Sequence, residues 1–352
     1  MEISTPGRIC LFGEHQDYLG LPIIALAISL RINMSGKKIS GKVIDINMPD
    51  IKEQKKISLD DLDYRDSRDY FRSGIKVCQN EGLRFSEGFT CKIKSQIPIK
   101  AGTSSSSALV VSWINFLSRM ADDSVKWDQK KIAELAYKAE VEEFSESGGM
   151  MDQYSTSLGE MIYLESSPKV RVKKINTNLG TFVLGDSGEE KDTMKILDRC
   201  KLNQKLVLDK IYQNNSQFDL CKKSQTLDLS ILTEIEKKIF NGLLKNKNIL
   251  ELAYLELKKS NLNKPFVGNL LLEHHQVLRD VLKVSTPKID RMIEAAMKAG
   301  ALGGKINGSG GGGCMFAYAP TNPEKVANAI KSVGGKTYIV NSDIGTMKIK
   351  EV

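Results

Sequence analysis

The chain has 352 residues, which is long for a single hydrophobic core, so we expect two domains. The net charge of +8 is modest and spread along the sequence. A solvated lysine-rich surface explains this charge, although it also suits an anionic substrate such as a nucleotide. The sequence has no Arg-rich patch interleaved with aromatic residues, which argues against a nucleic-acid partner. The longest apolar run, residues 21–30, is too short to span a membrane.

The cysteines indicate a reducing compartment. They are scattered, without a CxxC pair or a zinc-binding spacing, at Cys10, Cys78, Cys91, Cys200, Cys221 and Cys314. Three of them lie inside apolar runs, which is typical of buried free thiols. The first eight residues do not form a signal peptide. We therefore expect a cytoplasmic protein that has no membrane partner.

The first distinctive stretch begins with an apolar run, residues 9–12, that predicts a buried strand. Glu14, His15 and Asp17 follow just past its end, where a strand delivers side chains into a crevice. Carboxylates beside an imidazole can accept hydrogen bonds from the vicinal hydroxyls of a sugar. They could also hold a metal ion, although their spacing matches no metal template, or form a solvated turn.

Strands are predicted next at residues 23–32 and 39–46, followed by a helix at residues 66–79. This helix carries Tyr70 and Phe71, whose rings could stack on a nucleotide base. Packing in a hydrophobic core is the commoner role of such aromatic side chains.

A serine-rich loop, residues 98–108, lies between a strand-like alternation at residues 89–95 and helical apolar spacing from Leu109 onward. Gly102 allows the backbone to turn, and residues 103–106 are good helix N-caps. The free N–H groups of such a helix start suit a phosphate. Serine hydroxyls can also donate to phosphate oxygens or ligate Mg²⁺. The alternative is a polar loop that only caps the helix.

Carboxylates then occur among apolar residues. The predicted helix at residues 127–144 places Glu140 and Glu143 on or beside its apolar stripe. Burial of an unpaired carboxylate is costly, so a metal ion or a basic side chain is expected beside one of them. Further along, Gly149 permits close backbone approach, and Asp152 lies among apolar residues, where it is functional or caps the next helix.

Short strands are predicted from residue 161 to residue 183, and the remainder is mostly helical. We expect a domain boundary there, which divides the chain into residues 1–182 and 183–352. The helices of the second part are predicted at residues 192–212, 229–245, 249–260, 267–282, 288–299 and 324–332, and its strands at residues 314–318 and 338–340.

A glycine-rich stretch, residues 303–313, contains the spacing of a dinucleotide-binding fingerprint at Gly308, Gly310 and Gly313. That fingerprint must open a helix, whereas here a strand follows, and no early βαβ unit precedes it. So many glycines indicate instead that the backbone lies close to a ligand or to another strand.

Three stretches in fixed order resemble the motifs of the GHMP kinases, which include galactokinase, homoserine kinase, mevalonate kinase and phosphomevalonate kinase. Residues 7–18 resemble the galactokinase signature, residues 98–109 the phosphate loop, and residues 305–314 the third, glycine-rich motif. Residues 140–153 resemble the galactokinase segment from the metal-binding Glu to the catalytic Asp, and residues 273–290 are also similar to galactokinase. The resemblance covers nearly the whole chain. It implies an α/β (α+β) fold with two GHMP kinase lobes and an active site in the cleft between them.

The resemblance implies ATP and Mg²⁺ as cofactors and a small sugar as the acceptor. Ser106 and Glu140 would hold Mg²⁺, with Ser105 as a close rival of Ser106. Asp152 would accept the proton of the attacking hydroxyl or hold it in line, and Arg8 would keep Asp152 ionised and offset charge on the transferring phosphoryl group. The ATP phosphates would lie against Gly102, Thr103, Ser104, Ser105, Ser106 and Ser107.

Further contacts follow from the same resemblance. The acceptor would contact Glu14, His15, Asp17, Asp152 and the backbone of Gly149. Phe71 would flank the adenine base. The third motif would comprise Gly308, Gly310, Gly312 and Gly313.

The sequence departs from the family pattern mainly near the expected sugar site. Gln16 replaces the usual Thr, Ser147 and Gly148 replace Pro-Cys, and residues 185–193 are acidic where a basic stretch containing Thr-Gly is usual. In the phosphate loop, the family residues Gly, Gly and Leu are replaced by Lys100, Ala101 and Thr103. The residues for phosphate transfer are otherwise kept.

The leading hypothesis is therefore an ATP- and Mg²⁺-dependent kinase that phosphorylates the anomeric C1 hydroxyl of galactose or a galactose-like sugar. Another hexose, a uronic acid or a heptose are alternative acceptors. A sensor that binds ATP and sugar without turnover and a dinucleotide-dependent oxidoreductase are hypotheses of other classes. We expect a monomer or a weak homodimer.

Overall fold

The fold is that of a computed structural model, which describes residues 1–98, 102–190, 192–220 and 227–350. Lys100, Ala101 and Cys221 lie outside the described residues. The chain forms two compact units, of which the first comprises Met1–Ile9, Leu26–Ile162 and Asn341–Val352, and the second Cys10–Ala25 and Tyr163–Val340. Each unit therefore takes more than one segment of the chain, whereas the lobes expected from sequence are contiguous.

The first unit is built on a mixed sheet with the strand order β13-β1-β2-β6-β4-β5. Within it, β4 is parallel to β6, and the pairs β1–β13, β2–β6 and β4–β5 are antiparallel. Strand β3 (Lys38–Ile39) pairs with β6, and β7 (Met161–Glu165) pairs with β2. Strand β8 (Arg171–Lys174), a part of the second unit, pairs with β7. The other bounds are β1 Glu2–Phe12, β2 Ile23–Ser35, β4 Val43–Met48, β5 Glu53–Ser58, β6 Gly88–Ser95 and β13 Met347–Lys350.

Alternation of side chains along the strands separates the two faces of this sheet. In β4, Ile44, Ile46 and Met48 are buried, while Asp45 and Asn47 point to the other face. The predicted strand at residues 39–46 is divided into β3 and β4, because Gly41 turns the chain at φ +90°.

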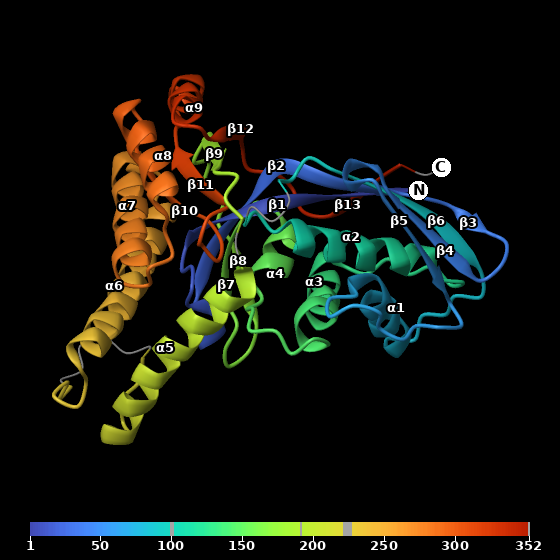
Figure 1. The fold of residues 1–352 in the computed structure, drawn as a ribbon, viewed down its shortest axis with the longest axis horizontal. Helices are drawn as coiled ribbons and strands as arrows, with labels where there is room; N and C mark the ends of the chain where they lie inside the picture. Colours follow the sequence, from blue (N-terminus) through green and yellow to red (C-terminus); the bar gives the residue numbers. More distant parts are fainter. Residues whose placement is uncertain (99–101, 191, 221–226, 351–352) are drawn as a thin grey trace. The chain divides into compact units, whose positions relative to one another are not determined.

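Helices cover the buried face of this sheet (Figure 1). They are α1 (Tyr70–Asn80), α2 (Ser105–Met120), α3 (Gln129–Tyr137) and α4 (Met151–Leu158), with a π-helical turn at Lys138–Glu142. The predicted helix at residues 127–144 is therefore α3 and this turn. Asp69 and Asp128 cap α1 and α3 by accepting hydrogen bonds from backbone N–H groups of the first turn.

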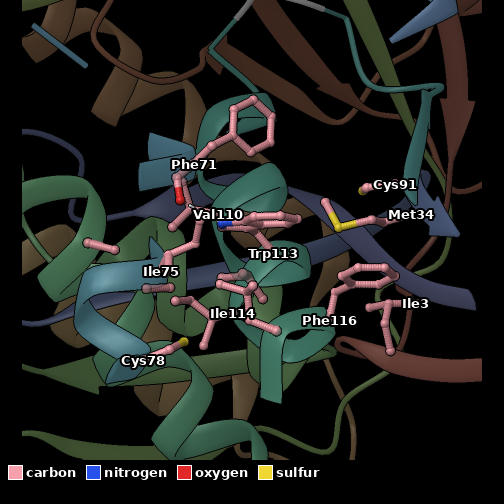
Figure 2. Packing of buried hydrophobic residues seen from close by; sticks show 14 of the residues in the cluster. Ile3, Met34, Phe71, Ile75, Cys78, Cys91, Val110, Trp113, Ile114 and Phe116 are labelled. Carbon is pink, nitrogen blue, oxygen red and sulfur yellow. Dashed lines mark hydrogen bonds between the residues drawn. The ribbon is translucent and has the colours of Figure 1, made fainter. Parts of the chain in front are cut away.

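Aromatic side chains fill the core between α1, α2 and the sheet (Figure 2). Trp113 stacks on Phe116 with ring centroids 6.0 Å apart, and Phe71 meets Trp113 edge-on at 5.3 Å. Gly74 allows this approach, since a Cβ there would lie 2.5 Å from Cδ1 of Trp113. Phe71 is only 6% exposed. The structure therefore places Phe71 in the core, where its ring is covered by protein rather than open to an adenine base.

The second unit contains an antiparallel sheet with the order β10-β11-β9-β12. Helices α8 and α9 pack on this sheet, through a core that includes Ile289, Met292 and Ile330. The strands are β9 Phe182–Asp186, β10 Gly303–Ile306, β11 Cys314–Tyr318 and β12 Lys336–Val340. The helices are α5 Thr193–Asn214, α6 Glu234–Leu257, α7 Lys264–Asp280, α8 Pro287–Lys298 and α9 Pro323–Ser332.

The two helices predicted at residues 229–245 and 249–260 form a single helix, α6. The polar residues between them include neither Gly nor Pro, so nothing interrupts the backbone hydrogen bonds. A capping box formed by Thr233 and Glu236 sets the start of α6 later than predicted.

The last part of the chain returns to the first unit, which the sequence did not predict. β13 pairs with β1, and Thr346 enters a buried chain of hydroxyl groups. Thr5 Oγ1 lies 2.7 Å from both Thr346 Oγ1 and Ser112 Oγ, and Asn115 donates to Thr346 Oγ1 at 3.1 Å.

In the described part of the chain, no helix combines the length and apolar character that crossing a bilayer requires.

Candidate active site

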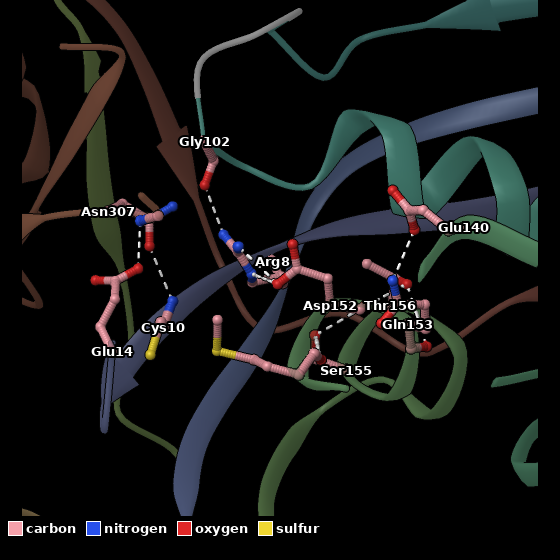
Figure 3. A network of polar contacts seen from close by, with 12 residues as sticks. Arg8, Cys10, Glu14, Gly102, Glu140, Asp152, Gln153, Ser155, Thr156 and Asn307 are labelled. Carbon is pink, nitrogen blue, oxygen red and sulfur yellow. Dashed lines mark hydrogen bonds and ion pairs between the residues drawn. The ribbon is translucent and has the colours of Figure 1, made fainter. Parts of the chain in front are cut away.

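The centre of the candidate site in the first unit is a partly buried ion pair between Arg8 of β1 and Asp152 in the first turn of α4 (Figure 3). Nε and Nη2 of Arg8 lie 2.8 and 2.7 Å from Oδ1 of Asp152. Arg8 also donates through Nη1 to the carbonyl of Gly102, and its backbone N–H donates to the carbonyl of Thr103. Arg8 therefore connects β1 to α4 and to the loop before α2 through hydrogen bonds. Its side chain is 3% exposed, whereas that of Asp152 is 28% exposed and accessible to a substrate.

The serine-rich loop reaches α2 through a left-handed residue. Ser104 is the N-cap at φ +59°, and its side chain makes no capping hydrogen bond. Ser104 Oγ is buried and finds no hydrogen-bond partner among the described residues. The expected side-chain cap is thus replaced by a helix start whose first N–H groups remain available to an anion. Ser107 is buried, while Ser105 is half-buried and Ser106 is exposed.

Glu140 is the carboxylate that points inward from the π-helical turn. It is 5% exposed, and its Oε2 accepts a hydrogen bond from Gln153 Nε2 at 2.7 Å. Burial raises the pKa of Glu140 to about 7, helped by the charge of Asp152 and opposed by hydrogen bonds from Gln153, Ser107 and Ser106. Of the two carboxylates left open by the sequence, Glu143 is exposed and accepts a hydrogen bond from Tyr64.

These groups fit a nucleotide and Mg²⁺ in their chemistry. Mg²⁺ is usually bound by one or two carboxylates together with substrate phosphates, and Glu140 beside Ser106 and Ser107 offers such oxygen ligands. Among the described residues, no cluster of three or more His, Cys, Asp or Glu side chains could hold a metal without added ligands. The hydroxyl of Ser104, which has no partner among the described residues, and the start of α2, which has no side-chain cap, supply donors for phosphate oxygens.

The raised pKa of Glu140 predicts a pH-dependent stability in the absence of metal. Because the folded protein holds this proton more tightly than the unfolded chain, the stabilisation is fully present below pH 4.5 and is lost as the pH rises through about 7. Glu140→Gln removes this dependence. Between pH 5 and pH 8, the free energy of unfolding of the wild type should therefore fall by up to about 3 kcal/mol relative to that of the variant. Denaturant unfolding of both proteins in EDTA measures the difference.

Glu143→Gln is the matched control, because it changes an exposed carboxylate of the same segment. The free energy of unfolding of this variant should change between pH 5 and pH 8 as much as that of the wild type. Equal pH dependence of the wild type and Glu140→Gln would contradict the assignment of this titration to Glu140.

A second cluster lies in the second unit, where the loop after β1 meets the glycine-rich loop after β10. Glu14 is 2% exposed, and its two carboxylate oxygens accept hydrogen bonds from Lys305 Nζ and from the backbone N–H of Gly308. Lys305 is fully buried. Glu14 is therefore a fixed carboxylate with a paired charge, and its remaining lone pairs can still accept hydrogen bonds.

His15 is held by protein groups on both sides of its ring. Its Nε2 lies 3.0 Å from the carbonyl of Ser309, and its Nδ1 lies 3.2 Å from Tyr18 Oη. Because a carbonyl only accepts, Nε2 carries a proton, and in the neutral ring Nδ1 accepts from the tyrosine hydroxyl. His15 adopts a left-handed backbone at φ +62°, which these two contacts hold in place. Both ring nitrogens are thus engaged within the protein.

The remaining candidates for acceptor contacts lie in loops. Asp17 starts the short 3₁₀ turn Asp17–Leu19 of the second unit and is half-buried. Gly149 lies in the first unit, in the loop that precedes α4, and is also half-buried. Their roles in binding the acceptor stay predictions.

The glycine-rich loop packs against protein backbone in the same unit. Gly308, Gly310, Gly312 and Gly313 all have positive φ. A Cβ at Gly310 would lie 2.5 Å from the carbonyl oxygen of Val284, and one at Gly312 would lie 2.9 Å from that of Glu189. The loop is followed by strand β11, so it does not open a helix, and the dinucleotide fingerprint is not formed.

Sequence reasoning missed several residues of these clusters. Lys305 and Asn307 gave no signal beyond their place in the third motif, and Gln153 is an ordinary helical residue in sequence. His274 is 1% exposed, and neither ring nitrogen makes a hydrogen bond with the described residues that meets the usual geometry. Burial, and then the charge of Lys305, lower the pKa of His274 well below its usual value, so its ring is neutral.

A groove of about 410 Å³ lies apart from both clusters, on the solvent face of the sheet of the first unit. None of the predicted site residues lines it. Its lining consists of Ser35, Gly36, Lys37, Asp45, Asn47, Gln54, Thr90, Cys91 and Lys92.

Comparison with protein families gives three matches along the chain. Residues 2–38 match the profile described as the galactokinase galactose-binding signature. Residues 69–160 match the N-terminal domain of the GHMP kinases, and residues 262–336 match their C-terminal domain.

Two named relatives match almost end to end. A mevalonate kinase of Thermococcus onnurineus is 30% identical over 99% of this chain and 98% of its own length. A galactokinase of Clostridium tetani is 26% identical over 97% of this chain and 91% of its own length. Among solved structures, Lactococcus lactis galactokinase complexed with galactose superposes with a TM-score of 0.83 at 22% identity, covering 99% of this chain and 95% of that one. The two-domain fold, with its mixed helices and sheets, is thus shared with this galactokinase structure.

Proposed function

The chain belongs to the GHMP kinase family, whose members are ATP-dependent kinases, and we propose that it phosphorylates the anomeric C1 hydroxyl of galactose or a galactose-like sugar. The observation that carries the proposal lies within the first unit. Arg8 holds a partly exposed Asp152, and the same unit contains the uncapped serine helix start and the buried Glu140.

The chemistry needs little covalent help from the protein. Phosphoryl transfer is governed by positioning and by stabilisation of charge on the transferring group. We infer that Asp152 orients the acceptor hydroxyl and takes its proton, while Arg8 holds this carboxylate in place. The start of α2 and its serine hydroxyls would bind the phosphates of ATP. Glu140 and Ser106 would hold Mg²⁺, which when bound neutralises charge on those phosphates.

The sugar is supported by the galactose-binding signature at residues 2–38, which includes Glu14, His15 and Asp17. Glu14 is well suited to accept an O–H group because its charge is paired and its position is fixed. The acidic stretch at residues 185–193 departs from galactokinases, so the acceptor class includes other hexoses, uronic acids and heptoses.

Mevalonate is the second candidate acceptor. The mevalonate kinase of Thermococcus onnurineus is 30% identical to this chain, compared with 26% for the galactokinase of Clostridium tetani. Both acceptors present a hydroxyl to the γ-phosphate, so Arg8 and Asp152 would act in the same way on either.

A coupled assay of ADP release tests these acceptors with the purified protein, ATP and Mg²⁺. Galactose, other free hexoses, uronic acids, heptoses and mevalonate are supplied separately, and ³¹P NMR locates the phosphate on the product. We expect turnover on a free sugar with the phosphate on C1. Turnover on mevalonate alone would reject the sugar. ATP and sugar binding without turnover would instead support a sensor.

A further inference from the structure

The glycine-rich third motif contacts the sugar signature residue by residue within the second unit. At Cys10, near the end of β1, the backbone N–H donates to Asn307 Oδ1 and the carbonyl accepts from Lys305 Nζ, both at 2.9 Å. Lys305 lies in β10 and Asn307 directly follows the strand, two residues further on, so their side chains point the same way. The side chains of Lys305 in β10 and of Asn307 just after it thus bond both polar groups of the Cys10 backbone (Figure 3 shows the contact with Asn307).

The end of β10 and the glycine-rich loop after it also contact the loop that follows β1, which contains Glu14 and His15. Lys305 pairs with Glu14, the N–H of Gly308 donates to the second oxygen of Glu14, and the carbonyl of Ser309 accepts from His15. Consecutive parts of the third motif therefore contact successive positions of the first. Gly308 and Gly310 have positive φ, which directs the backbone groups of this loop toward their partners.

Lys305 is a fully buried cation, and Glu14 is 2% exposed. The ammonium group also lies 5.2 Å from the ring centroid of Phe316, which adds a weaker attraction. The nearby ring of His274 is neutral and adds no charge. The charge of Lys305 is thus directed at Glu14 and at the Cys10 carbonyl.

Stability alone is a poor explanation for such a pair. Removing two charges from water costs free energy that their attraction often fails to recover, and apolar side chains of similar volume would stabilise the fold at least as well. A charged carboxylate with a fixed orientation is, however, what a loop needs if it is to accept hydrogen bonds from hydroxyls of a bound acceptor.

We propose that Lys305 is a positioning residue for the acceptor: it fixes the orientation of Glu14, and through Glu14 the third motif shapes the loop that binds the sugar. This inference rests on the proposed function of that loop. It assigns to the third motif a role in acceptor binding that is separate from any contact with ATP.

Steady-state kinetics of Lys305→Met, Lys305→Arg, Glu14→Gln and the double variant Glu14→Gln/Lys305→Met test the proposal. Loss of a charge-assisted hydrogen bond predicts that Lys305→Met raises the acceptor KM about tenfold or more, while the ATP KM changes less than about twofold. Lys305→Arg keeps the positive charge and should retain most of the acceptor affinity.

The double variant separates positioning from stability. Lys305→Met leaves the charge of Glu14 buried and unpaired, so its unfolding temperature should fall, and Glu14→Gln should recover part of this loss in the same chain. The acceptor KM should not recover, because the carboxylate is gone. Lys259→Met is the matched control: it removes the partner of Glu256, another buried carboxylate of the second unit, and should leave the acceptor KM unchanged.

An unchanged acceptor KM in folded Lys305→Met, or equal rises in the KM of acceptor and ATP, would overturn the positioning role while leaving the proposed function intact. Recovery of the acceptor KM in the double variant would do the same. A wild-type protein that phosphorylates no acceptor would instead reject the proposed function, and the positioning role with it.

Discussion

Asp152→Asn is expected to lower kcat for the best acceptor by roughly 10³-fold, the range observed when a positioned proton acceptor is lost. The amide keeps the shape of the side chain, and its oxygen can still accept hydrogen bonds from Arg8. It cannot take a proton from the acceptor hydroxyl. The coupled ADP-release assay measures kcat, and the KM for ATP should change little because Asp152 is not expected to contact the nucleotide.

Asp128→Asn is the matched control for this change. Asp128 also belongs to the first unit and accepts a hydrogen bond near a helix start, from the N–H of Lys131, but it is exposed. The control variant should keep wild-type turnover. Near-normal kcat in Asp152→Asn would remove Asp152 from the reaction.

Arg8→Met is expected to lower kcat by roughly 10²- to 10³-fold and to destabilise the fold. The change removes the partner of Asp152 and the donor to the Gly102 carbonyl, so both the carboxylate and the loop before α2 lose their fixed positions. Arg8→Lys keeps the charge but loses the planar fork that reaches both groups, so it should recover only part of kcat. Kinetics and thermal unfolding of both variants measure these effects.

Arg31→Met provides the comparison that separates stability from catalysis. Arg31 pairs with Asp343 and donates to Ser4 and to backbone carbonyls, so its loss should also destabilise the first unit. None of these partners belongs to the candidate site. If Arg31→Met and Arg8→Met lost kcat to the same extent at a temperature where both are folded, the role of Arg8 would be structural only.

The sequence predicted the local elements that carry the candidate phosphate site, because their signals are local. Small residues between an alternating strand and a periodic helix predicted β6 and α2, and both are observed. The apolar stripe of the predicted helix at residues 127–144 identified Glu140 and Glu143 as candidates. Only the fold could separate them, since a π-helical turn sets which carboxylate faces inward.

Contacts between residues far apart in the chain left no such signal. Cys10 and Asn307 are separated by 297 residues, and Glu14 and Lys305 by 291. Periodicity places each residue on its own element but cannot pair elements across such distances. For the same reason Phe71 could be placed on a helix, α1, but its contact with Trp113 of α2 could not be predicted.

The way in which the first unit closes has a consequence for biosynthesis. Strand β13 supplies the neighbour of β1, and Thr346 meets Thr5 across 341 residues. On a ribosome, therefore, the hydroxyl chain around Thr5 lacks a member until Thr346 has been translated, whereas the second unit, which ends at Val340, is synthesised before that point. Nascent chains that stop before residue 341 should present an open edge at β1, and a chaperone that shields such edges would matter most at this late stage.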